Sequence, residues 1–256
     1  MINGDYSFYY APYDSMPEFY LTDFEESGWD RIDVPSMWQY RGYGKPAYPN
    51  VLYDIPFNPP YVSCENPVGY YRRHFSFSPL NSGGRVILHF DGVDNAFYVY
   101  LNGKEVGMSK GSRMPAEFDV TDIIKEGDNL LAVKVFTHSD ATYLENQDML
   151  LANGIFRDVY LIDTPAVSVW DYEIISDLNG IDLTVNLSAK GDGYTVCAEL
   201  GSAKAKASAV GETVKLRLEP ENPILWNAEN PYLYNLTFTL DKDGMKRKKS
   251  RNSGFK

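Results

Sequence analysis

Hydrophobic and polar residues alternate along most of the chain with a period of two, which is typical of β-strands that bury one face. No segment repeats apolar residues at the helical period over three turns, and only residues 120–127 suggest a short helical turn. The pattern therefore predicts an all-β, antiparallel protein. The inward-facing positions of the four clearest strands are Val86, Leu88 and Phe90; Leu131, Val133 and Val135; Ile181, Leu183, Val185 and Leu187; and Tyr232, Tyr234, Leu236, Phe238 and Leu240.

Turn residues divide these strands and suggest two β-sandwiches. Asn102-Gly103, Asn179-Gly180 and Asp243-Gly244 adjoin strands, and such pairs tolerate the positive φ angles of tight hairpins. The boundary is expected near Thr164-Pro165-Ala166, where one strand pattern ends and another begins. We therefore predict a first domain at residues 1–165 and a second at 166–256, which at roughly 90 residues has the size of an immunoglobulin-like sandwich.

Two long segments do not fit the strand pattern. Residues 35–67 contain seven prolines together with many aromatic residues, and residues 139–159 mix acidic, amide and apolar side chains. Long irregular segments in compact domains are usually functional or disordered, and the aromatic content argues against disorder. Both segments are therefore candidates for a binding site.

Charge and cysteine content narrow the classes of function. The net charge of −11 argues against nucleic acid or an anionic membrane as a partner. All of the excess lies in residues 1–165, with 12 Lys/Arg against 23 Asp/Glu, whereas residues 166–256 have 12 of each. No stretch reaches the length of a membrane span, and the N-terminus lacks the features of a signal peptide. With only Cys64 and Cys197, a disulfide framework is not expected, and we predict a cytoplasmic protein.

Several familiar motifs are better explained without catalysis. The three histidines lack zinc-ligand spacing, and His138-Ser139-Asp140 is interpreted as a coincidence because a triad needs residues from separate segments. Ser82-Gly83-Gly84 is expected to form a turn and not a phosphate loop. The basic run at residues 246–251 fits a charged edge strand or an interdomain linker better than a nucleic-acid site.

Carboxylates in the second irregular segment are the most interesting chemical groups. Glu145 and Asp148 could form the carboxylate pair of a glycosidase, but spacing in a loop fixes no geometry, and a solvated or capping role is the alternative. Asp148 stands out because Asn146, Gln147 and Asn153, which carry further oxygen atoms, are nearby in the sequence. Such a setting suits sugar hydroxyls or a hard cation.

Four motifs in the sequence are specific, namely YPNV (48–51), ENPVGYY (65–71), TYLENQDM (142–149) and GIFRDV (154–159). With LWNAENPYLYNLTF in the second domain, they closely resemble the LacZ-type β-galactosidases of glycoside hydrolase family 2. The resemblance extends from Ile2 to Phe255. It implies a galactose-binding-like jelly-roll sandwich followed by an immunoglobulin-like sandwich. It also implies a (β/α)₈ barrel carrying both catalytic glutamates, which would need about 250 residues beyond this chain.

The resemblance assigns roles in substrate binding to two residues. Asn50 in YPNV and Asp148 in NQDM match positions that contact galactose, and Asp148 also matches a sodium ligand. A family member of full length is expected to need Na⁺, to hold Mg²⁺ in the barrel, to act on β-galactosides such as lactose and to form a homo-oligomer. This chain alone is then expected to lack catalytic residues and activity. One departure is Leu150, because the family often has an aromatic residue after QDM.

Two other interpretations remain open. The jelly roll could be a stand-alone carbohydrate-binding module, which would bind galactosides without a partner domain. Alternatively, the two domains could serve mainly as an oligomer interface, which would give a stable dimer or tetramer in light scattering.

Overall fold

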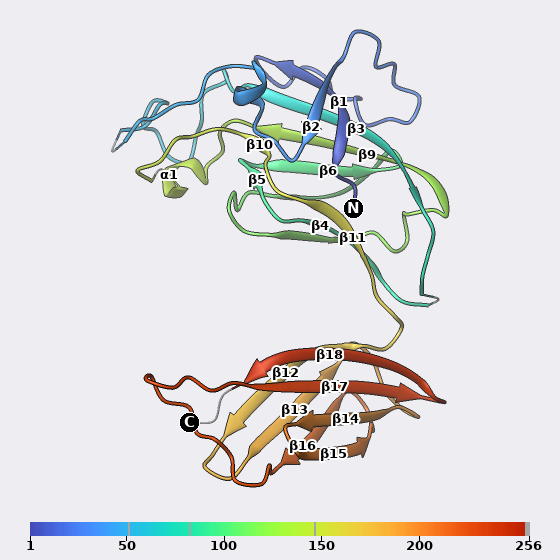
Figure 1. The fold of residues 1–256 in the computed structure, drawn as a ribbon. Helices are drawn as coiled ribbons and strands as arrows, with labels where there is room; N and C mark the ends of the chain where they lie inside the picture. Colours follow the sequence, from blue (N-terminus) through green and yellow to red (C-terminus); the bar gives the residue numbers. More distant parts are fainter. Residues whose placement is uncertain (51, 82, 146, 254–256) are drawn as a thin grey trace. The chain divides into compact units, whose positions relative to one another are not determined.

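Antiparallel β-strands make up nearly all of the regular structure in a computed structural model, which describes residues 1–50, 52–81, 83–145 and 147–253 (Figure 1). Contacts between residues divide the chain into two units. Unit 1 contains residues 1–81 and 85–163, and unit 2 contains residues 164–253 with the short segment 83–84. Unit 1 is a jelly-roll sandwich and unit 2 an immunoglobulin-like sandwich, so the predicted all-β class is confirmed.

Unit 1 is built on a six-stranded sheet in the order β2-β1-β3-β9-β6-β7. A three-stranded sheet, β11-β4-β8, and the short pair β10-β5 complete it. The elements are β1 (Gly4–Ala11), β2 (Asp30–Val34), η1 (Trp38–Arg41), β3 (Val68–Phe77), β4 (Val86–Phe90), β5 (Val93–Asp94), β6 (Phe97–Leu101), β7 (Lys104–Ser109), β8 (Ala116–Asp119), β9 (Gly127–Phe136), α1 (Thr142–Glu145), β10 (Gly154–Ile155) and β11 (Val159–Asp163).

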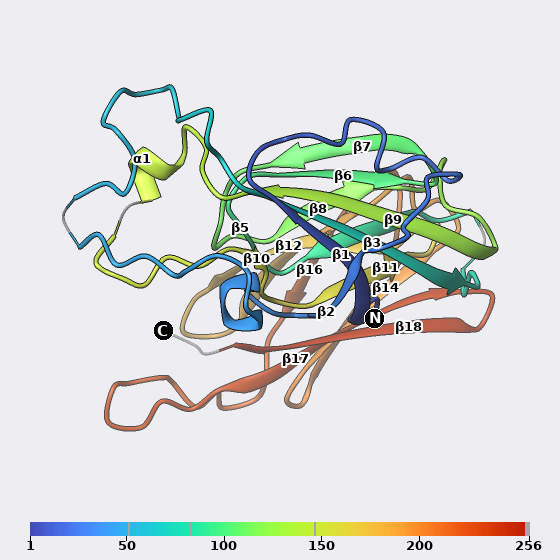
Figure 2. The same cartoon turned by 90° about the horizontal axis from the view of Figure 1, so that it is seen from above.

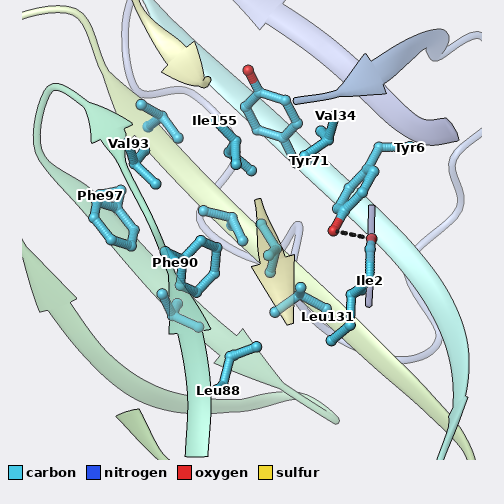
Figure 3. Packing of buried hydrophobic residues seen from close by; sticks show 14 of the residues in the cluster. Ile2, Tyr6, Val34, Tyr71, Leu88, Phe90, Val93, Phe97, Leu131 and Ile155 are labelled. Atoms are coloured by element: carbon cyan, nitrogen blue, oxygen red, sulfur yellow. Dashed lines mark hydrogen bonds between the residues drawn. The ribbon is translucent and has the colours of Figure 1, made fainter. Parts of the chain in front are cut away.

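The core of unit 1 contains the apolar faces that the alternation predicted. Val86, Leu88 and Phe90 of β4 are buried, as are the alternate residues of β9 from Leu131 onward. Figure 3 shows several of these side chains packed together, with the Tyr6 hydroxyl donating a 2.9 Å hydrogen bond to the carbonyl of Ile2. This bond satisfies a buried hydroxyl, whose desolvation would otherwise oppose folding.

Unit 2 pairs the sheet β12-β13-β16 with the sheet β15-β14-β17-β18. Seven strands in two antiparallel sheets are the arrangement of an immunoglobulin-like sandwich. Its core takes one face of β13 from Ile181 to Leu187 and one face of β17 from Leu236 to Leu240, whereas Tyr232 is exposed and lies outside the strand. The elements are β12 (Val169–Ser176), β13 (Ile181–Leu187), β14 (Thr195–Leu200), β15 (Ala203–Ser208), β16 (Thr213–Leu218), β17 (Tyr234–Lys242) and β18 (Met245–Ser253).

Two of the three predicted hairpin turns have the expected backbone. Asn102-Gly103 joins β6 to β7 and Asp243-Gly244 joins β17 to β18, each pair with two positive φ angles. Asn179-Gly180 differs because Asp177 caps it, accepting hydrogen bonds from both backbone N–H groups at 2.7 and 2.9 Å. The basic run 246–251 lies in β18 at the edge of its sheet, as the edge-strand interpretation expects.

Other sequence expectations concern the few helical segments, or fall outside the described residues. Residues 120–124 form a single turn, in which the carbonyl of Val120 accepts from the N–H groups of Ile123 and Ile124, both at 2.9 Å, as the expected short helical turn requires. The only described α-helix, α1, lies in the second irregular segment, where the alternation pattern predicted none. Val51, Ser82 and Asn146, which belong to motifs named above, lie outside the described residues.

Candidate functional site

Two long loops of unit 1 extend from the same end of its strands. We call residues 42–67 the first loop and residues 137–153 the second loop. The first runs into β3 and the second leaves β9, and these strands pair so that Val68 lies opposite Phe136. Asn66 joins them just beyond the strands, exchanging hydrogen bonds of 2.8 and 2.9 Å with the backbone of His138. The strand register therefore brings together segments that are distant in sequence.

Further contacts fasten the two loops along their length. Ala47 and Leu151 form a β-bridge with N–O distances of 3.0 and 2.8 Å. The Tyr53 hydroxyl donates to the carbonyl of Tyr143 at 2.9 Å, and the Tyr143 hydroxyl donates to the carbonyl of Tyr61 at 2.7 Å. Figures 1 and 2 show both loops and α1 extending together on one side of unit 1. These contacts join the described parts of the two loops into one surface.

The two residues assigned to sugar binding lie on this surface. Asp148 is exposed in the second loop, and its Oδ1 accepts a 2.5 Å hydrogen bond from the hydroxyl of Tyr48 in the first loop. This hydrogen bond raises the pKa of Tyr48, because deprotonation would place two anions in contact. Asn50, also exposed, follows two residues later with a φ of 54°. Tyr48, which sequence reasoning missed, therefore links Asp148 to the loop that carries Asn50.

A buried polar network connects the second loop to the sandwich of unit 1. Asp94, only 5% exposed, receives a 2.9 Å hydrogen bond from Asn153 Nδ2 and lies 2.7 Å from Arg113 Nη1. Asn153 in turn pairs with Gln39 through two hydrogen bonds of 2.8 Å. Burial raises the pKa of Asp94 to about 6, and the nearby Glu145 adds to this, while Arg113 opposes it.

A cavity of about 50 Å³ borders this network, and its lining also includes Lys45, Asp54 and His138. It has room for a few water molecules only. Sequence reasoning missed the network. The available signal was Asp94, which directly follows the apolar Val93. A carboxylate that is buried in a strand needs a charged or hydrogen-bonding partner, so its position indicates such a network.

The possible carboxylate pair is not brought together by hydrogen bonds. Glu145 accepts from the backbone N–H of Ser112 at 3.0 Å and from its hydroxyl at 2.5 Å, whereas Asp148 accepts from Tyr48. Glu145 therefore has a capping role in this structure. The two carboxylates have separate partners, which does not favour a glycosidase pair within this chain.

The sequence His138-Ser139-Asp140 is not a catalytic triad. Asp54 lies 3.7 Å from His138 Nε2, while the Ser139 hydroxyl donates to Asn95 at 2.5 Å. Asp140 pairs with Lys110 at 2.6 Å. The three side chains thus engage three separate groups, which agrees with the interpretation as coincidence.

The structure places one further oxygen atom at Asp148, that of the Tyr48 hydroxyl, whereas Asn153 belongs to the buried network of Asp94 and Gln39. Among the described residues, no group of three His, Cys, Asp or Glu side chains is placed to hold a metal ion. A hard cation takes several oxygen ligands, of which a single carboxylate provides one or two. The assignment of Asp148 as a sodium ligand stays a prediction.

Two family models match the chain, "Glycosyl hydrolases family 2, sugar binding domain" at residues 1–165 and "Glycosyl hydrolases family 2" at residues 167–256. The chain belongs to glycoside hydrolase family 2. Among curated relatives, a β-galactosidase of Alteromonas mediterranea is 38% identical over 100% of this chain, and one of Psychromonas ingrahamii is 36% identical over 95%. The chain spans 27% and 26% of those proteins, about a quarter of their length.

Solved structures of β-glucuronidases share the fold. A Bifidobacterium dentium β-glucuronidase is similar with a TM-score of 0.67 and 21% identity, over 99% of this chain and 47% of its own. A Bacteroides uniformis β-glucuronidase gives a TM-score of 0.68 and 19% identity, over 97% of this chain and 31% of its own. At these identities the likeness shows the architecture alone. Within the described part of the chain, no helix is long and apolar enough to cross a membrane.

Proposed function

We propose that this chain is the noncatalytic N-terminal portion of a retaining β-galactosidase that hydrolyses terminal β-D-galactosides such as lactose. Its first and second loops complete the galactose pocket, and the catalytic glutamates belong to a (β/α)₈ barrel outside this sequence. The 36–38% identity to β-galactosidases supports the substrate class. The single observation that carries the role of the loops is the Tyr48–Asp148 hydrogen bond, which joins the two predicted sugar-binding motifs.

The chemistry of these side chains suits sugar positioning. An ionised Asp148 accepts hydrogen bonds from sugar hydroxyls, while the amide of Asn50 both donates and accepts. Tyr48 already fixes one carboxylate oxygen of Asp148, so this side chain loses less conformational freedom when a sugar binds. Neither Asp148 nor Asn50 transfers a proton in this proposal. They act by orientation, which contributes to the rate when it aligns the reacting bond.

Charge favours a neutral galactoside over a glucuronide. A glucuronide carries its own carboxylate, and residues 1–165 hold 23 acidic against 12 basic side chains. Like charges brought together at a binding surface weaken binding. An enzyme that uses Asp148 to contact sugar is therefore expected to discriminate against an acidic sugar ring.

Ions and assembly belong to the same proposal. A bound Na⁺ would add positive charge beside the sugar, and Asp148 would be its ligand from this chain. Mg²⁺ is expected in the barrel, and the whole enzyme is expected to be a cytoplasmic homo-oligomer. Both cysteines, Cys64 and Cys197, are free, which suits a reducing compartment.

The test compares hydrolysis of a chromogenic β-galactoside by the 256-residue chain and by an enzyme that joins it to the barrel. We expect an inactive chain and an active enzyme. In the enzyme, Asp148→Asn is expected to lower kcat/KM by about 100-fold or more, with stability nearly unchanged. Asn50→Gly keeps the positive φ and isolates the loss of the amide. The exposed Asp23→Asn, elsewhere in unit 1, is the matched control.

Three results would contradict the proposal. Activity of the chain alone would mean that a carboxylate pair had been overlooked within it. Unchanged activity of Asp148→Asn would refute the assignment of the site. Tight galactoside binding by the chain alone, with no turnover by the enzyme, would favour a stand-alone binding module. Light scattering of the chain separately tests the interface interpretation, which expects a stable dimer or tetramer.

A further inference from the structure

A third segment, residues 110–115 between β7 and β8, contacts the second loop at successive points. Lys110 Nζ lies 2.6 and 2.8 Å from the carboxylate oxygens of Asp140, where the second loop begins. Ser112 binds Glu145 through its backbone N–H and its hydroxyl. The second loop is therefore held from one side by the first loop and from another by residues 110–115, which we call the brace.

Arg113 is the member of the brace that lies nearest to the sugar-facing end of the loop. Its Nη2 donates to the sulfur of Met149 at 3.2 Å, directly beside Asp148 in the chain. Its Nη1 lies 2.7 Å from Asp94 Oδ2. One planar guanidinium thus connects the loop residue next to the proposed sugar ligand with a carboxylate on the sandwich. The rigid, planar guanidinium of an arginine fixes the relative position of the two groups it contacts better than the flexible ammonium group of a lysine would.

The sandwich end of this connection is firmly held. Asp94 belongs to β5, its side chain is 7% exposed, and its other oxygen accepts from Asn153. Arg113 is itself tied to the chain beyond β10, because its carbonyl accepts a 3.1 Å hydrogen bond from Arg157. Its side chain is 30% exposed, so the guanidinium is partly shielded from solvent. An ion pair with one buried member is screened less than a surface pair.

We propose that Arg113 is a positioning residue for Asp148, anchored by Asp94, and that it sets where the sugar-facing carboxylate lies. The assignment rests on the proposed function, since it concerns the same sugar site. Displacement of a substrate-orienting group by about 1 Å can lower the rate by about 100-fold. Loss of the Arg113 connection is therefore expected to lower kcat/KM by about 10- to 100-fold, although the residue does not touch the sugar.

The test removes both charges together, because Arg113→Met alone would leave Asp94 buried without its partner and could prevent folding. The variant is Asp94→Asn with Arg113→Met. Its control is Asp14→Asn with Lys134→Met, a similar pair in which Lys134 is 13% exposed and lies 2.8 Å from Asp14, with both residues outside the two loops and the brace. Thermal unfolding of each chain shows that it is folded. Two readouts follow, namely amide hydrogen exchange in residues 147–151 and the separate kcat and KM of the enzyme for a β-galactoside.

We expect the Asp94/Arg113 variant to exchange faster at residues 147–151 and to lose galactosidase efficiency, with the control close to the parent in both. Normal exchange in a folded variant would overturn the mechanical part of the inference, whatever the enzyme does. Faster exchange with unchanged kcat and KM would show that Arg113 orders the loop without positioning the sugar ligand, and would also overturn the inference. A parent enzyme that does not hydrolyse β-galactosides would instead refute the proposed function, and the exchange result alone would then decide whether the brace orders the loop.

Discussion

The buried carboxylate of Asp94 gives unit 1 a stability that depends on pH in an unusual direction. Burial holds the pKa of Asp94 at about 6, above the 3.8 of a free aspartate, even though Arg113 lies beside it. The protonated form is thus favoured in the folded state more than in the unfolded state. Asp94→Asn replaces it by a neutral group of the same shape that cannot titrate.

The sign and size of the effect follow from linkage. A raised pKa in the folded state contributes stability that is fully present below pH 3.8 and is lost as the pH rises through about 6. The gap between these values corresponds to about 3 kcal/mol, since one pH unit is worth about 1.4 kcal/mol. The parent chain is therefore expected to gain up to about 3 kcal/mol relative to Asp94→Asn between about pH 8 and about pH 4.

Urea unfolding at a series of pH values measures this difference, provided that the signal reports unit 1. Trp29 and Trp38 lie in unit 1, while Trp170 and Trp226 lie in unit 2 and are 58% and 38% exposed. A background with Phe at the last two positions restricts tryptophan fluorescence to unit 1. Asp94→Asn is then compared with its parent in that background.

A control with the opposite sign strengthens the experiment. Asp119 is half exposed, and its hydrogen bonds with Thr121 lower its pKa. The stability it contributes is present above the unfolded pKa and is lost as the pH falls through the folded value. Relative to Asp119→Asn, the parent should therefore lose stability on acidification. A difference between parent and Asp94→Asn that does not change with pH, or that changes with this opposite sign, would refute the reasoning.

Three further outcomes are expected. Glu145→Gln should shift the pH dependence due to Asp94 to lower pH, because the Glu145 charge contributes to the raised pKa; an unshifted profile in urea titrations would contradict this. Gly69→Ala should destabilise unit 1 by about 1–3 kcal/mol in urea, since the new Cβ would lie 2.7 Å from the ring of the fully buried Trp38, and a neutral effect would mean that the core yields easily. In an enzyme that joins the chain to the barrel, Tyr48→Phe should lower kcat/KM for a β-galactoside by about 2- to 10-fold, because it releases the Asp148 carboxylate that we propose binds the sugar. Steady-state kinetics with unchanged values would remove Tyr48 from the proposed site.

The strands were predictable because a sheet with one buried face places its apolar side chains at alternate residues. Leu88 on β4 and Val133 on β9 could be assigned to the core without knowledge of any partner strand. The short turn at residues 120–124 was also predictable, whereas the four-residue helix α1 was missed because it is too short to show a helical period. Short helical segments depend on tertiary contacts more than on local preference.

The sequence could supply only part of the candidate site. Asn50 and Asp148 were assigned through motifs, and their role in sugar binding stays a prediction. The hydrogen bond of the Tyr48 hydroxyl between the loops depends on pairing between segments that no local pattern reports. Asp94 and Arg113 were missed for the same reason, because their interaction joins segments that are distant in the sequence pattern. Non-local contacts of this kind require the strand order, which the sequence pattern does not specify.

The register of β3 with β9 also has a consequence for the order in which the chain folds. The bridge between Ala47 and Leu151 closes a span of about a hundred residues, which by itself carries a large loss of chain entropy. Once Val68 and Phe136 are paired, only the two loops remain to be closed. The sandwich is therefore expected to form first and the loop surface last, so that loop substitutions accelerate unfolding while leaving the folding rate nearly unchanged.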